Sequence, residues 1–166
     1  IPGKNTAFTL AEAKTTTELT RNDLDFNLAI NGSLSDFNIR PGDRLNITLS
    51  LKNQSVNDLK KAVLKLTLDA PAIKKQSVLD WPKIEDKYDG DTRGVQLGDT
   101  LRRGEITWGQ SKIPELAKII SGQEIILDIG LPIKDQSAIN LSDLATSSQI
   151  IVLAEVSFKD KDGVSH

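Results

Sequence analysis

The chain has 166 residues, of which 38% are hydrophobic and 27% charged, a composition that indicates a packed core and excludes wholesale disorder. Lysine and arginine (21) nearly balance aspartate and glutamate (23), so no basic excess favours nucleic acid as a partner. The sequence has no cysteine, which excludes both a disulfide framework and a thiolate metal site.

Apolar and polar residues alternate with a period of two over much of the chain, which predicts strands with one buried face. In chain order, the clearest stripes cover 24–30, 45–51, 62–68, 125–133 and 150–158. Shorter strands are expected at 7–11, 78–81, 95–97 and 105–108. Turn residues such as Asn31-Gly32 and Asp69-Ala70-Pro71 separate them. The sequence therefore predicts an all-β fold, an antiparallel β-sandwich.

Little helix is expected. Pro114 followed by 115–120 and closed by Gly122 predicts one or two helical turns. Residues 134–148 are polar and are expected to form a loop with a turn of helix at 141–144. The longest apolar runs, such as 150–154, are far below the roughly 20 residues that span a bilayer, so we expect no direct membrane insertion by this segment.

Two blocks resemble the immunoglobulin-like "conserved repeat" domains of bacterial and archaeal cell-surface proteins. NIRPGDRL at 38–45 leads into LSLKNQS at 49–55, and ITW at 106–108 is followed by IPEL at 113–116 and SGQ at 121–123. The resemblance implies an immunoglobulin-like sandwich over 23–166. Residues 1–22 would then be an extra N-terminal strand or the end of a preceding repeat. The polar stretch 83–103 departs from the pattern and is interpreted as an insertion.

The sequence supplies little catalytic chemistry. Its single histidine is His166 at the C-terminal end, so a triad or a histidine-metal scheme is not expected. We therefore predict no enzyme but a non-catalytic structural or adhesive module of a modular prokaryotic surface protein. By the same resemblance its location is extracellular, at the cell surface, and its partners are neighbouring repeats of the same protein or surface proteins and glycans.

The segment 86–91 concentrates three carboxylates, those of Asp86, Asp89 and Asp91. Oxygen-rich loops of this kind can hold Ca²⁺. The alternative, which we favour, is a plain acidic turn whose charge Lys87 and Arg93 neutralise. The expectation is thus no cofactor, with calcium at these three aspartates as the competing hypothesis.

Trp81 and Tyr88 supply the alternative function, a carbohydrate-binding module. Exposed aromatic rings can stack on sugars, and both residues lie near the polar stretch 83–103. The competing interpretation is core packing, which we favour for both Trp108 and Trp81. Trp81 precedes Pro82, which is also compatible with an exposed strand end at a rim.

Overall fold

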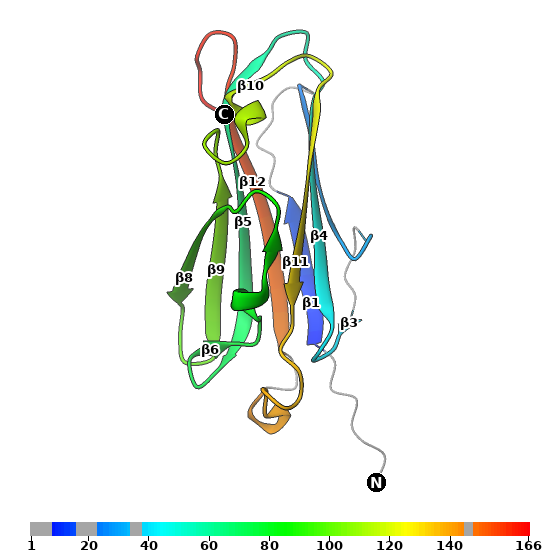
Figure 1. Cartoon of the computed structure of the whole chain (residues 1–166), viewed down its shortest axis with the longest axis vertical. Helices are drawn as coiled ribbons and strands as arrows, with labels where there is room; N and C mark the ends of the chain where they lie inside the picture. Colours follow the sequence, from blue (N-terminus) through cyan, green and yellow to red (C-terminus); the bar gives the residue numbers. More distant parts are fainter. Residues whose placement is uncertain (1–7, 16–22, 34–37, 145–147) are drawn as a thin grey trace.

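The computed structural model describes residues 8–15, 23–33, 38–144 and 148–166, and in them two β-sheets pack face to face (Figure 1). The predicted all-β sandwich with little helix is confirmed. The large sheet has the order β3-β1-β12-β5-β9-β8, and β6 and β10 also pair with β5. The small sheet has the order β2-β4-β11-β7. The strands run roughly along the longest axis of the molecule (Figure 1).

The elements of the described residues follow one another without a long helix. In chain order they are β1 (Phe8–Thr15), β2 (Leu24–Ile30), β3 (Asn38–Ile39), β4 (Arg44–Asn53), β5 (Leu59–Ile73), β6 (Gln76–Ser77), η1 (Trp81–Lys83), β7 (Glu85–Asp86), β8 (Asp91–Gln96), β9 (Leu101–Trp108), η2 (Pro114–Ala117), β10 (Lys118–Ile119), β11 (Glu124–Pro132), η3 (Leu141–Asp143) and β12 (Gln149–Lys159). The three η elements are short 3-10 helices. No helix among these described ranges is long and apolar enough to cross a membrane.

The core lies between the sheets and is built from the predicted stripes. In β4, Leu49 is fully buried and lies between Leu28 of β2 and Leu127 of β11 in the small sheet. In the large sheet, Leu66 of β5 lies opposite Ala154 of β12 and Ile106 of β9, all buried. Each large aliphatic side chain buried in this way contributes about 1.5–3 kcal/mol relative to exposure.

The predicted turn at Asp69-Ala70-Pro71 is wrong, because β5 continues through it to Ile73. Asp69 points to the outer face, where Arg103 of the neighbouring strand binds its carboxylate. Pro71 lacks an amide hydrogen, but its carbonyl still accepts from Val78 N. The ion pair with Arg103, 34 residues further along the chain, thus allows the Asp69 carboxylate to lie within a strand.

The predicted strand at 78–81 is also wrong. Val78 and Leu79 are buried, and Leu79 forms an isolated antiparallel β-bridge with Ile133, the residue after β11 of the small sheet. The chain then turns at Trp81 into η1, with Pro82 in its first turn. The helix predicted after Pro114 is limited to η2, and residues 118–119 form β10 instead.

The polar stretch 83–103, interpreted as an insertion, is part of the sandwich. It forms β7 at the edge of the small sheet, and β8 with the start of β9 at the edge of the large sheet. The predicted strands at 95–97 and 105–108 therefore belong to one antiparallel hairpin, β8–β9.

The first described strand, β1, joins the large sheet and pairs in parallel with β12. It overlaps the predicted strand at 7–11, of which Ala7 lies outside the described residues. The expected boundary at residue 22 also lies outside them and stays a prediction.

Candidate functional site

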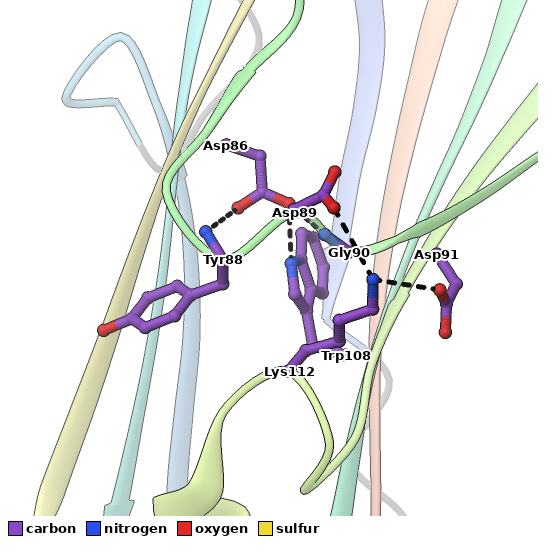
Figure 2. A network of polar contacts seen from close by, with 7 residues as sticks. All are labelled: Asp86, Tyr88, Asp89, Gly90, Asp91, Trp108 and Lys112. Carbon is purple, nitrogen blue, oxygen red and sulfur yellow. Dashed lines mark hydrogen bonds and ion pairs between the residues drawn. The ribbon is translucent and has the colours of Figure 1, made fainter.

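The Asp86 carboxylate organises the loop between β7 and β8. Its Oδ1 accepts a hydrogen bond from Tyr88 N at 3.0 Å, and its Oδ2 accepts from Gly90 N at 2.7 Å. The same Oδ2 accepts from Trp108 Nε1 at 2.8 Å (Figure 2). Trp108 has no exposed surface, so this contact satisfies a buried indole N–H that would otherwise lose a partner.

Gly90 allows the loop to pass directly over the buried tryptophan. A Cβ at Gly90 would lie 2.4 Å from Trp108 Nε1 and 2.6 Å from Ile106 Cγ2. Any side chain there would push the loop outward and separate Asp86 from Trp108. The carboxylate, the glycine and the indole therefore form one structural unit.

Asp89 and Asp91 have a different partner. Lys112 Nζ lies 3.7 Å from Asp89 Oδ2 and 3.3 Å from Asp91 Oδ1, between the two (Figure 2). The Asp89 side chain is 99% exposed, whereas both Asp86 oxygens already accept hydrogen bonds. Within the described part of the chain, no three His, Cys, Asp or Glu side chains gather as a metal-binding group. Calcium at Asp86, Asp89 and Asp91 stays a prediction.

Trp81 lies in a second feature, a groove of about 320 Å³ between η1 and the β8–β9 hairpin, which we call the edge groove. A Cβ at Gly104 would lie only 1.9 Å from Trp81 Cζ2, so the indole packs directly on the backbone of β9. Trp81 is half-buried and contacts the core with part of its surface. The glycine in the strand makes room for the ring.

The edge groove is cationic. Arg93, Arg102, Arg103 and Lys134 are among its lining residues, and none of the described residues that line it is acidic. Strand register places the side chains of Arg93 and Arg103 on the outer face of the large sheet, whereas Arg102 shares the inner face with Gly104, on which Trp81 packs. Arg103 is the neutralised member: its Nε and Nη2 each donate to Asp69 at 2.6 Å, and these hydrogen bonds raise the pKa of the guanidinium. Arg102 instead donates to a backbone oxygen, that of Lys75, at 3.0 Å.

The structure does not bring Trp81 and Tyr88 together in the edge groove. Tyr88 is half-buried against the core, with Lys87 Nζ 5.3 Å from its ring centroid, and it does not line the groove. Trp108 is core, as predicted. Sequence reasoning missed the edge groove. The signal that could have found it is the repeated Arg-Gly pair, Arg93-Gly94 and Arg103-Gly104, whose glycines face each other on β8 and β9 and leave room for the Trp81 ring.

Comparison with known proteins identifies no family for this chain. No sequence-family profile matches it, and neither does any curated protein. Among solved structures, the CBM3 of Hungateiclostridium clariflavum is similar at 13% identity and a TM-score of 0.43, over 79% of this chain and 91% of that one. A family GH18 chitinase from Chromobacterium violaceum is similar at 18% identity and a TM-score of 0.31, over 78% of this chain but 18% of the chitinase chain. At these scores neither comparison assigns a ligand or an activity.

Proposed function

We propose that this chain is a structural module of a modular extracellular protein that bears mechanical tension. The first and last strands of the described residues, β1 and β12, carry this tension. The observation behind the proposal is the parallel pairing of β1 with β12, from Thr9 opposite Gln149 to Thr15 opposite Ala154. The remaining long neighbours in the described sheets are antiparallel.

Parallel pairing decides how tension reaches the ladder. The start of β1 lies beside the start of β12, and β12 ends at the opposite end of the molecule (Figure 1). Tension between the start of β1 and the end of β12 therefore acts along both strands in opposite directions. The backbone hydrogen bonds between them then share the load and must break together, whereas a ladder opened from one end breaks bond by bond.

The strand that receives this load is itself well anchored. On its other side, β12 pairs with β5 from Ile151 opposite Asp69 to Lys159 opposite Lys60. Its inward side chains Ile150, Val152 and Ala154 are fully buried in the core. Sliding β12 would therefore break a second ladder and expose apolar surface at the same time.

Buried polar side chains support the same interpretation, because their hydrogen bonds fasten the strand ends to the neighbouring loops. Asn53 is fully buried and donates to the carbonyls of Asn57 and Ile119, while its oxygen accepts from Ser55 N. Among the described residues, no buried side-chain nitrogen or oxygen lacks a hydrogen-bond partner. A rigid spacer needs such internal satisfaction. The resemblance of 38–55 and 106–123 to repeats of surface proteins supports an extracellular location beside similar modules.

Force spectroscopy on single molecules tests this proposal with a matched pair of pulling geometries. The chain has no cysteine, so single cysteines can serve as attachment points. In the first geometry, tension acts between the N-terminus and a cysteine placed after His166. In the second, it acts between the N-terminus and Gln149→Cys at the start of β12, which opens the same ladder from one end. The proposal requires a severalfold higher unfolding force in the first geometry. Equal forces would refute it.

A further inference from the structure

The edge groove is lined by cationic and aromatic residues that the proposed mechanical role does not require, and these residues point to an anionic ligand. The whole chain carries a formal net charge of −2, yet the described residues that line the groove include four cationic residues and no acidic one. On the outer face of the sheet, Arg103 pairs with Asp69 and Arg93 lies opposite Glu105. Arg102 lies on the inner face, donates one hydrogen bond to the Lys75 carbonyl and retains further guanidinium donors for a carboxylate.

The groove also holds a flat apolar surface beside these charges. The indole of Trp81 occupies the space where a side chain at Gly104 would lie, and the Arg102 guanidinium lies over Gly94, opposite Gly104 on the edge strand. Thr92, Gln76 and Ser77 add hydroxyl and amide groups to the lining. A sugar ring presents an apolar C–H face and a polar hydroxyl rim, which fit an indole beside such groups.

A second hollow of about 650 Å³ continues the groove. The two share Gln76, Ser77 and Lys134, and the second is also lined by the amide residues Gln136 and Asn140 and by the acidic Asp143. The negative charge of a ligand is therefore favoured in the edge groove, and the second hollow suits its hydroxyl groups. The combined lining of the two hollows extends from Trp81 to the loop after β11. This arrangement fits an extended ligand of several units better than a single small anion.

The turn between β5 and β6 is strained at the junction of the two hollows. Lys74 and Lys75 form a two-residue turn with φ of 50° and 67°, a left-handed conformation that Asn-Gly adopts with less strain. In this conformation the Lys75 carbonyl accepts the hydrogen bond from Arg102 Nη1, and Lys74 lines the second hollow. Backbone strain retained at a polar surface is a pointer to function.

From these observations together we propose that the edge groove and its neighbouring hollow bind an acidic oligosaccharide, a chain of sugars that carry carboxylates. A sugar ring stacks on Trp81, and its carboxylate pairs with Arg102 and Lys134, the cationic residues of the lining other than the outward-facing Arg93 and Arg103. This inference is independent of the load-bearing role, because the groove lies at the β8 edge and the proposed load path at β1 and β12.

Calorimetric titration with oligogalacturonate tests this inference, with the fully methyl-esterified oligosaccharide as the ligand control. The two share every sugar ring but differ in charge, so binding of the acidic form alone is expected, weakening as salt rises. Equal binding of both forms, or of neither, would overturn the inference. Poly-glutamate is the third probe, and binding as tight as that of the oligosaccharide would replace the saccharide with an acidic peptide.

Variants locate the site. Arg102→Gln and Lys134→Gln should each weaken binding about tenfold, since each removes a charge-assisted hydrogen bond. The matched control Arg40→Gln removes one exposed arginine that does not line the groove and should leave the affinity unchanged. Trp81→Phe keeps an aromatic ring and should weaken binding less than Trp81→Ala, with thermal unfolding to verify that each variant folds. Equal losses for Arg40→Gln and Arg102→Gln would contradict the assignment.

Discussion

Trp81 precedes the β8–β9 hairpin and Trp108 ends it, yet the two tryptophans have opposite surroundings. Trp108 is fully buried, and its only polar atom binds the carboxylate of Asp86. Trp81 is half-buried, lies on the backbone of Gly104 and lines a groove that also includes the cationic residues Arg102 and Lys134. The acid-rich loop, which looks like a ligand site in sequence, stabilises the fold. The edge groove, whose lining residues are scattered in sequence, is the surface that we propose for ligand binding.

The largest expected effect comes from removing the carboxylate beside Trp108. Asp86→Ala leaves Tyr88 N, Gly90 N and Trp108 Nε1 without this acceptor, and we expect a loss of about 3 kcal/mol in the free energy of unfolding. Urea denaturation measures it. The control Asp89→Ala removes an exposed carboxylate of the same loop and should change stability by less than about 0.5 kcal/mol. Similar losses for both would show that Asp86 has no special structural role.

A smaller effect is expected at the second tryptophan. Gly104→Ala places a Cβ where the Trp81 ring lies, so the ring must move out of its seat, at a cost of about 1–3 kcal/mol. Gly98→Ala is the matched control on the same hairpin, because nothing lies within 4 Å of its Cβ position. Thermal unfolding and tryptophan emission together measure stability and ring position. An unchanged emission maximum in Gly104→Ala would mean that Trp81 does not depend on this glycine.

The strained lysine turn should respond in the opposite direction. The double variant Lys74→Asn/Lys75→Gly relieves two left-handed lysines, and we expect it to stabilise the fold by about 1 kcal/mol. It also removes two cations, so binding of the acidic oligosaccharide should weaken. A variant that gains stability and keeps full affinity would remove the turn from the proposed site.

The smallest effect is expected for calcium. Three donors already occupy the Asp86 oxygens, and Lys112 lies between Asp89 and Asp91. We therefore expect the same unfolding midpoint in Ca²⁺ and in chelator. A bound ion would raise the midpoint by mass action, and such a rise, lost in Asp89→Ala, would restore the calcium hypothesis.

Much of the sandwich could be predicted because its core strands alternate strictly. Leu45 to Leu51 in β4 and Ile125 to Ile133 around β11 encode their buried face locally, through every second residue. β8 could not be predicted in the same way. Its sequence DTRGVQ is almost fully exposed at a sheet edge, so no apolar stripe marks it.

The functional residues were harder to predict, because their partners are distant in sequence. Asp86 was identified as a ligand candidate, but its bond to Trp108 joins residues 22 positions apart. The continuation of β5 past Asp69 depends on Arg103, and the edge groove depends on strand register at the Gly94–Gly104 pair. Composition and spacing carry no information about which strands become neighbours.

Acrylamide quenching of two single-tryptophan variants tests the contrast between the tryptophans most directly. Trp81→Phe leaves Trp108 as the reporter, and Trp108→Phe leaves Trp81. We predict that Trp108 resists quenching and ignores oligogalacturonate, whereas Trp81 is quenched when free and protected when the acidic oligosaccharide is added. Equal quenching of the two, or a ligand response from Trp108 alone, would contradict the assignment of one tryptophan to the core and the other to a binding groove.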